Sequence, residues 1–396
     1  MPEKYDHLII GGGIVGLSIG LELLNKYPSA QVLLVDKEET TGLHASGRNS
    51  GVLHAGFYYS PDSLKAKFCL QGNLELREII AADSIPLNEC GKVVVAQNEE
   101  DLVRLEALFQ RGITNGVNLE LLPEADMEKI EPLAKTFKKF LWSPMTAVSN
   151  PEMVTESIKS RFIKRGGQIR TNGTAAFSKD GGVLINAQEV RADNIINAAG
   201  TGAIHLAHSA GVGSDYAQLP VLGLYKITPS QNLPLSRLVY PVPNPKNPFL
   251  GVHFTLTVDG SVKIGPTAIP VLGREQYSLQ DVPDLLDIRS SFSSIFAMMK
   301  DSPRNLLNLA TTELPKISLR VLTEGGARLV PSSNNKIIWK TKKPGMRAQL
   351  VSLTTGKFEM DYVVRKHENQ VHVLNAVSPG WTSSLPFARW IVSKYL

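Results

Sequence analysis

The chain has 396 residues, of which 43% are hydrophobic and 20% are charged. This length exceeds one typical domain and is enough for two sizeable cores. The formal net charge of +5 is a mild excess, and without a dense stripe of Lys and Arg it argues against nucleic-acid binding.

The two cysteines, Cys69 and Cys90, are too few for a disulfide framework or a thiolate metal site, and no other ligand cluster indicates a metal. The apolar stretch 8–24 contains Glu22 and several glycines, which argues against a signal peptide or a membrane span. We therefore expect a cytoplasmic protein, with peripheral attachment to the inner membrane as an open alternative.

The first 36 residues predict a β-α-β unit. Residues 6–10 are typical of a short buried strand, and residues 14–25 have the apolar spacing of a helix. Residues 31–36 predict a second buried strand, so the whole unit has the expected length of about 30 residues.

A glycine fingerprint joins the first strand to this helix. Gly11 permits a tight turn, Gly13 leaves room for a pyrophosphate beside the backbone, and Gly16 lets helix and strand pack closely. Asp36 ends the second strand, where an acid accepts hydrogen bonds from an adenosine ribose. Strand, turn, helix and acid together predict dinucleotide binding, with Ile14, Val15 and Lys37 as flanking contacts.

The rest of the chain alternates between two kinds of segment. Strands are expected at 93–96, 192–200, 357–365 and 370–375, and helices at 99–111, 150–165 and 385–395. A loop or short helix is expected at 119–130. Proline-rich strands at 219–270 and helical runs at 280–326 indicate a different domain from 215 to 340.

This interleaving predicts an α/β protein, α+β overall, with a Rossmann-like dinucleotide domain and a discontinuous second domain. We expect the second domain, for the substrate, to be built on a mostly antiparallel sheet with helices. The expected cofactor domain comprises 1–85, 141–215 and 341–396, and the expected substrate domain comprises 86–140 and 216–340.

The choice between FAD and NAD depends on further small-residue segments. Residues 44–52 (HASGRNSGV) form a loop dense in small donors, and residues 194–202 (NIINAAGTG) give another close approach of glycine backbone. Several such segments suit an extended FAD better than a nicotinamide cofactor.

Segments along nearly the whole chain resemble a known family. The N-terminal unit, SGRNSGVLHAGFYY from Ser46 and the NAAG turn resemble the D-amino-acid-oxidase-like flavoenzymes. The segments from Leu250, Asp259, Gly345 and His372 are similar to L-2-hydroxyglutarate dehydrogenases and oxidases. Beyond the fingerprint, the resemblance implies FAD contacts at Ser46, Arg48, Asn49, Ser50, Gly51, Val52, Ala199, Gly200, Gly380, Trp381, Thr382 and Ser383. Arg48 and the pair Gly380-Trp381 depart from the residues common in the family.

Three residues carry the expected chemistry. Oxidation of a 2-hydroxy acid needs a flavin to take the hydride, a base for the hydroxyl proton and cations for the carboxylates. His54 follows the loop that the resemblance places at the flavin, and His253 is the second candidate base. Arg347, expected in a turn before an apolar strand, offers the bidentate guanidinium that grips a carboxylate.

The sequence therefore predicts FAD-dependent oxidation of L-2-hydroxyglutarate, a 2-hydroxy dicarboxylate, to 2-oxoglutarate. Oxygen and a membrane quinone are the alternative electron acceptors. An oxidase of amino acids or secondary amines, of the glycine or sarcosine type, is the nearest alternative, and a non-catalytic flavin protein is another. The final helix, with Phe387, Trp390 and Ile391, either docks on a membrane or packs on its own domain, which we favour.

Overall fold

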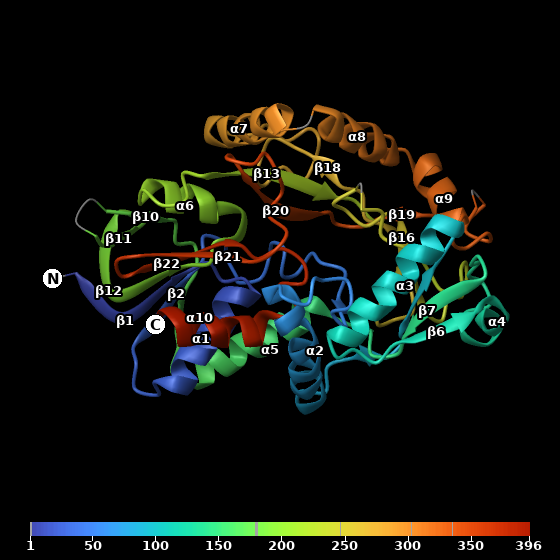
Figure 1. The fold of residues 1–396 in the computed structure, drawn as a ribbon. Helices are drawn as coiled ribbons and strands as arrows, with labels where there is room; N and C mark the ends of the chain where they lie inside the picture. The colour runs from blue at the N-terminus through green and yellow to red at the C-terminus, as the bar shows by residue number, and fades with distance from the viewer. Residues whose placement is uncertain (1, 179–180, 246, 302, 335) are drawn as a thin grey trace.

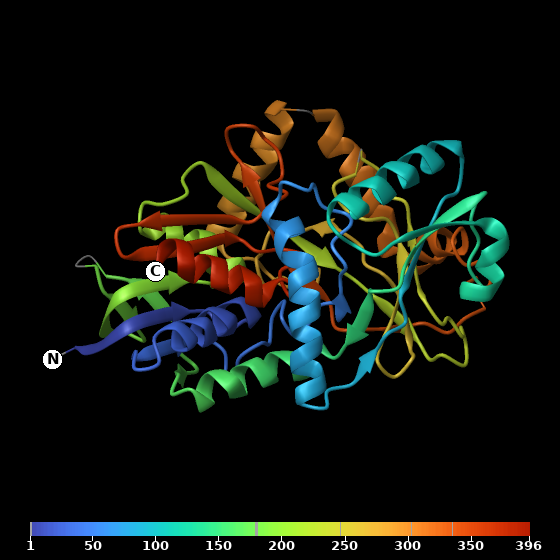
Figure 2. The ribbon, with the colours of Figure 1, turned by 60° about the horizontal axis from the view of Figure 1, so that its bottom comes forward.

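The computed structural model of the protein describes residues 2–178, 181–245, 247–301, 303–334 and 336–396. Within these residues, two eight-stranded sheets lie at opposite ends of the molecule (Figure 1). The long helix α2 (Leu64–Ala82) lies between them (Figure 2). One sheet is largely parallel and the other mostly antiparallel, which confirms the predicted fold class.

The first sheet has the strand order β10-β11-β12-β1-β2-β9, with β22 beside β12 and β21 beside β22. Its central strands are parallel, as a dinucleotide-binding unit requires. The strands are β1 (Glu3–Ile10), β2 (Val32–Val35), β9 (Gln168–Arg170), β10 (Ala175–Phe177), β11 (Val183–Ile185), β12 (Gln188–Asn197), β21 (Val363–His367) and β22 (Gln370–Asn375).

Both faces of this sheet are covered, which explains why its central strands are uninterrupted apolar runs. Side chains alternate along β1, so Ile9 packs with the helices on one face while Leu8 and Ile10 pack with the β10–β11 hairpin on the other. Figure 1 shows the helices below the sheet and α6 above it. The helices are α1 (Ile14–Lys26), α5 (Pro151–Lys164), α10 (Ser384–Tyr395) and, on the opposite face, α6 (Ala203–Ser209).

The second sheet has the order β19-β14-β17-β16-β15-β5-β7-β6, and only the β15–β5 pair is parallel among its described strands. Helices α3 and α9 contribute to its core. These elements are β5 (Lys92–Val95), α3 (Glu99–Thr114), β6 (Glu120–Pro123), α4 (Met127–Ile130), β7 (Lys139–Ser143), β14 (Lys226–Thr228), β15 (Leu238–Pro241), β16 (His253–Leu256), β17 (Val262–Gly265), α9 (Leu319–Ala327) and β19 (Lys340–Thr341).

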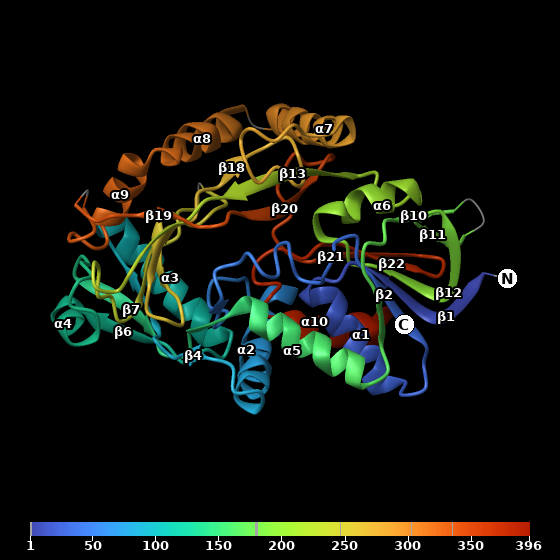
Figure 3. The ribbon, with the colours of Figure 1, turned by 180° about the vertical axis from the view of Figure 1, so that it is seen from behind.

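Two small sheets connect the two ends of the molecule. Strand β13 (Tyr216–Gly223) lies between β18 (Ile269–Pro270) and β20 (Gly345–Ser352), and helices α7 (Leu285–Asp301) and α8 (Pro303–Glu313) lie beyond them (Figure 3). The other small sheet contains β3 (Val52–Leu53), β4 (Leu87–Asn88) and β8 (Ala147–Ser149).

Local signals predicted several elements and missed others. The Asn150 side chain accepts hydrogen bonds from the backbone of Glu152 and Met153, which confirms the predicted helix start. The expected strand 357–365 is displaced, because residues after β20 form a turn at Gly356 before β21 begins. Helix α2 was not predicted, since its buried side carries Lys65 and other non-apolar residues that interrupt the apolar period.

The proposed domain boundaries can be compared with the strand pairing. Strand β7 crosses the proposed boundary at 140 and pairs with β5 and β6. Strand β20 was assigned to the cofactor domain but pairs with β13 along its whole length. The division into two domains stays a prediction with these two segments at its border.

The C-terminal helix α10 is part of the core. Phe387 and Ile391 are fully buried, and Phe387 and Trp390 pack against Phe68 of α2. The favoured expectation, that this helix packs on its own domain, is therefore confirmed. None of the helices in the described part of the chain has the length and apolar character needed to cross a bilayer.

Candidate functional site

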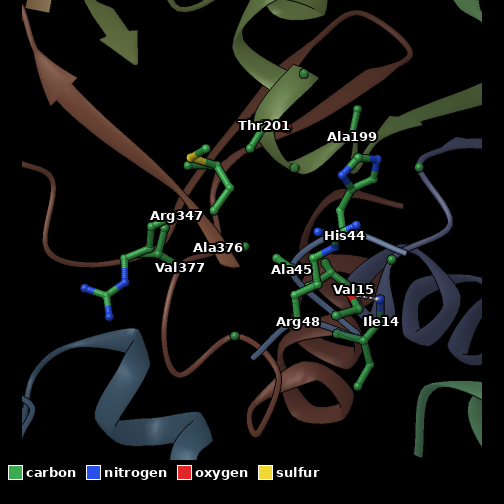
Figure 4. A pocket seen from close by; sticks show the side chains of 18 of the residues that line it. Ile14, Val15, His44, Ala45, Arg48, Ala199, Thr201, Arg347, Ala376 and Val377 are labelled. Atoms are coloured by element: carbon green, nitrogen blue, oxygen red, sulfur yellow. Dashed lines mark hydrogen bonds between the residues drawn. The ribbon is translucent and has the colours of Figure 1, made fainter. Parts of the chain in front are cut away.

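A cavity of about 600 Å³ collects residues from distant parts of the chain. Figure 4 shows Ile14, Val15 and Arg48 on one side of it and Arg347 on the other. The predicted site residues that line it are Gly11, Gly13, Ile14, Val15, Asp36, Lys37, Ser46, Arg48, Asn49, Ser50, Val52, His54, Ala199, Gly200, Arg347, Gly380, Trp381 and Thr382.

Four predicted site residues lie outside this lining: Gly16, Gly51, His253 and Ser383. A Cβ at Gly16 would overlap the Gly11 carbonyl oxygen, so this glycine serves the packing of α1 on the turn. Gly51 has a φ of +79° and faces the Ser149 carbonyl. Ser383 is fully buried just before α10.

The glycine turn builds a pyrophosphate cradle at the start of α1. Gly11 has a φ of +111°, and a Cβ there would lie 2.5 Å from the Ala198 carbonyl oxygen, so only glycine fits. Gly13 is the N-terminal cap residue of α1 and has no side chain that could accept a hydrogen bond from the first N–H groups of the helix. Instead, the Ser46 hydroxyl accepts a hydrogen bond from Ile14 N at 2.8 Å, which leaves the hydroxyl proton free to be donated to a phosphate.

Asp36 is held at the adenosine end by backbone hydrogen bonds. Its Oδ2 accepts from Gly12 N at 2.7 Å and its Oδ1 accepts from Glu38 N at 2.9 Å. Each oxygen keeps a further lone pair for a ribose hydroxyl. Lys37 pairs with Glu275, so its contact with a cofactor stays a prediction.

The loop 44–52 is fixed by its own side chains and by a distant segment. Asn49 donates to Ser46 O at 2.8 Å and accepts from Gly51 N at 2.8 Å, which holds the loop open. His44 lies 2.6 Å from the Tyr277 hydroxyl, and the Arg48 guanidinium lies over the same ring. His44 and Tyr277 line the cavity but were not predicted, because their contact spans a sequence separation that no local pattern reveals.

The segment 380–382, near the end of the chain, is hydrogen-bonded to the backbone at the end of the loop 44–52. The Thr382 hydroxyl donates to Val52 O at 3.1 Å and accepts from His54 N at 3.3 Å. A Cβ at Gly380 would overlap the Ala376 carbonyl oxygen, which explains why a glycine stands before the bulky Trp381.

His54 lines the cavity and is held by hydrogen bonds to its backbone. The His54 carbonyl accepts hydrogen bonds from Asn73 Nδ2 at 3.1 Å and Cys69 Sγ at 3.4 Å, both on α2. Its Nδ1 has no hydrogen-bond partner in the described part of the protein. Burial, reinforced by the nearby charges of Lys92 and Arg347, lowers the pKa of His54 well below its usual value of 6.5. The imidazole is therefore neutral at pH 7 and able to accept a proton.

Arg347 lies in β20, so the expectation of a turn was wrong. The strand begins at Gly345, where the absence of a side chain allows close approach to the Arg48 carbonyl oxygen. The Arg347 guanidinium lies 5.4 Å from the centre of the Phe249 ring and forms no ion pair with an acid among the described residues. Tyr225 lines the same part of the cavity, and burial raises the pKa of Tyr225 to about 12, so its hydroxyl remains a donor.

A buried lysine near His54, Lys92, was not singled out in the sequence. Lys92 is fully buried, and no described residue accepts a hydrogen bond from its Nζ. The Tyr240 ring centre lies 4.3 Å from that Nζ, and the ring of His253 stacks on Tyr240 with centroids 3.9 Å apart. Burial lowers the pKa of Lys92 to about 7 and that of His253 to about 3. His253 is thus part of this aromatic layer and does not line the cavity.

Comparison with known proteins assigns the chain to a family. The sequence profile of the family "FAD dependent oxidoreductase" (DAO) matches residues 6–394. The chain belongs to this family. It is 34% identical over 401 residues to an L-2-hydroxyglutarate dehydrogenase of Salmonella houtenae, covering 98% of this chain and 93% of that protein.

Solved structures share the fold. The fold is similar to that of an FAD-bound L-alpha-glycerophosphate oxidase from Mycoplasma pneumoniae, with a TM-score of 0.76, 26% identity and coverage of 98% of this chain and 94% of that one. A glycine oxidase from Geobacillus kaustophilus shares the fold with a TM-score of 0.71, 17% identity and coverage of 99% and 94%.

The residues of this flavoprotein fit its cofactor. FAD needs a pyrophosphate cradle, a ribose acceptor and a long cleft, and the Gly11 turn, Asp36 and the extended cavity meet these three requirements. FAD is therefore the cofactor, and the loop 44–52 and the segment 380–382 are the residues we propose to hold its flavin half.

Proposed function

We propose that the protein oxidises L-2-hydroxyglutarate to 2-oxoglutarate. The observation that carries the proposal is the meeting of His54 and Arg347 at one cavity, in a chain similar over its full length to L-2-hydroxyglutarate dehydrogenases. A neutral imidazole and an unpaired guanidinium supply what a 2-hydroxy acid needs, a proton acceptor and a carboxylate clamp.

The electrostatics favour a substrate with two negative charges. Lys92 and Lys65 lie buried near His54 and Arg347, and Asp361 is the acid that opposes Lys65. Burial lowers the pKa of Lys65 to about 8, so it still carries its charge at pH 7. Such an excess of positive charge in a poorly solvated region attracts a dianion more strongly than a zwitterionic amino acid.

Each residue then has one task in the reaction. Arg347 holds a substrate carboxylate with two parallel hydrogen bonds and so orients the carbon that bears the hydroxyl. His54 takes the hydroxyl proton on the ring nitrogen that faces the substrate. Bound FAD would supply the hydride acceptor for that carbon, and loss of the hydride together with the hydroxyl proton would give the 2-oxo acid. Oxygen or a membrane quinone is the proposed final electron acceptor.

Anaerobic titration tests this function. We expect L-2-hydroxyglutarate to bleach the flavin absorption of the purified holoenzyme, and the D isomer, glycine and sarcosine to leave it unchanged. Bleaching by glycine or sarcosine alone would instead identify an amine oxidase, and no bleaching by any of them would contradict the proposal. Steady-state rates with oxygen and with a soluble quinone would then identify the acceptor.

The pH profile should respond to Lys92. We expect Lys92→Met to move the acid limb of kcat/KM to higher pH by about 0.5–1 unit, because removing a nearby positive charge makes protonation of His54 easier and raises its pKa. Methionine fills a similar volume without a buried charge, so the fold is not expected to weaken. Lys159→Met, which removes a partly buried lysine of α5 with an ion pair to Glu156, is the control and should leave the limb in place. An acid limb unmoved in Lys92→Met would show that this lysine does not act on the base.

A further inference from the structure

The segment between β18 and α7 reaches the cofactor cavity. Its side chains Arg274, Glu275 and Tyr277 line that cavity, although none of them was among the expected cofactor contacts. The Gln276 side chain accepts hydrogen bonds from two backbone N–H groups of the same segment, which fixes its course as a turn. We call residues 273–277 the strap.

Tyr277 connects the strap to the loop that carries Ser46. The Tyr277 hydroxyl lies 2.6 Å from His44 Nδ1, and His44 Nε2 lies 2.9 Å from a Glu38 carboxylate oxygen. Since the carboxylate requires the proton on Nε2, Nδ1 of the neutral ring accepts a hydrogen bond from the tyrosine. The Arg48 guanidinium lies 4.1 Å from the centre of the Tyr277 ring. His44 and Arg48 stand on either side of Ser46 in the chain, so Tyr277 holds both flanks of the hydroxyl that we assign to the phosphate.

Glu275 makes a second contact with the first β-α-β unit. Its carboxylate is paired with the ammonium group of Lys37, which follows Asp36 in the chain. An ion pair between partly exposed side chains contributes little by itself. Together with the contacts of Tyr277, however, it connects the strap to the chain beside Asp36 and beside Ser46, the ribose and phosphate positions of the cofactor site.

The other side of the strap is connected to α6 through a buried acid. The backbone N–H of Arg274 donates to Asp287 Oδ2 at 3.0 Å, and Asp287 Oδ1 lies 3.2 Å from Nε2 of His205 in α6. His205 also lines the cavity, and α6 lies below α7 in the opposite views of Figures 1 and 3. The strap therefore bridges the cavity, from the chain around Ser46 on one side to α6 on the other.

We propose that the strap is part of the FAD site and must open before the cofactor can enter or leave. A segment connected on both sides of a dinucleotide cradle encloses the ligand, and an enclosed ligand exchanges only as fast as the enclosing segment opens. The strap belongs to the segment 216–340 that we expected to serve the substrate, so this segment also retains the cofactor. The inference does not depend on the identity of the substrate.

The rates of FAD release and uptake test the proposal. Release is followed by the fluorescence of free FAD after dilution of the holoenzyme, and uptake by mixing FAD with the full-length apoprotein. We expect Tyr277→Leu to accelerate both rates at least about tenfold, because it removes the hydrogen bond to His44 and the ring beneath Arg48. Tyr277→Phe loses only the hydroxyl, so both of its rates should lie between those of Tyr277→Leu and the wild type. It decides by the same comparison if Tyr277→Leu does not fold.

Tyr216→Leu is a control of the same kind. The Tyr216 hydroxyl accepts a hydrogen bond from Arg365, whose guanidinium lies over the tyrosine ring, but neither residue lines the cavity. Both FAD rates of this variant should equal those of the wild type, and an equal acceleration in it would overturn the proposal. Release that is not accelerated in Tyr277→Leu would remove the strap from the exchange path. Faster release without faster uptake would show that Tyr277 only stabilises the bound state, which also overturns the proposal.

Discussion

Replacing His54 with glutamine is expected to lower kcat for the oxidation of L-2-hydroxyglutarate by about 10²–10⁴-fold, the usual contribution of a general base. Glutamine keeps a polar side chain in the cavity but cannot take the hydroxyl proton at neutral pH. Asn73 donates to the carbonyl of residue 54 and the Thr382 hydroxyl accepts from its N–H, so these backbone hydrogen bonds survive the change. FAD content should therefore remain at the wild-type level.

The measurement is single-turnover reduction of the flavin under anaerobic conditions, which isolates the chemical step from reoxidation. His253→Gln is the matched control. Since His253 is stacked on Tyr240 and lies outside the cavity lining, its replacement is expected to slow flavin reduction by less than about tenfold. A larger loss for His253→Gln than for His54→Gln would reverse the assignment of the base.

Replacing Arg347 with methionine is expected to lower kcat/KM by about 10²–10³-fold, because a poorly solvated carboxylate would lose its charged, bidentate partner. Lysine at this position keeps the charge but lacks the two parallel N–H donors, so kcat/KM of Arg347→Lys should lie between those of Arg347→Met and the wild type. Most of the effect should appear in KM, since the carboxylate is held both in the bound substrate and in the transition state.

Arg365→Met is a close control for this change. Arg365 and Arg347 each stack on an aromatic ring at 5.4 Å, but Arg365 lies on β21 and does not line the cavity. The control should keep wild-type kinetics, because it removes an arginine stacked on an aromatic ring outside the cavity, together with that arginine's hydrogen bond to the Tyr216 hydroxyl. Equal kcat/KM in Arg347→Met and the wild type would remove this arginine from the substrate site.

The sequence predicted the parts of the site that depend on local chain geometry. The turn from Gly11 to Gly16 and the acid at Asp36 obey rules of spacing within one β-α-β unit, and the cap at Asn150 is equally local. The structure places these features where the spacing requires them. The loop 44–52 was indicated by its density of small donors, whereas the segment 380–382 needed a family resemblance, because it has no periodicity that points to a cofactor.

Residues that act through distant contacts were not predictable. Lys92 is the first residue of β5, whose sequence is that of an ordinary apolar strand. Its burial against Tyr240 depends on the pairing of β5 with β15. The apolar periodicity of helix α2 is interrupted at Gly72 and Asn73, because contacts with other segments require these two residues at their positions. A Cβ at Gly72 would overlap the Thr382 carbonyl, and Asn73 holds the carbonyls of Leu53 and His54.

The contact of Thr382 with Val52 and His54 has a consequence for how the protein is made in the cell. The ribosome releases the glycine turn and the loop 44–52 first, but Thr382, which lies between β22 and α10, is among the last residues to be synthesised. Until those residues emerge, the first sheet lacks two strands and the flavin half of the cavity lacks a wall. We therefore expect the flavin half of FAD to be held only after the whole chain has been synthesised.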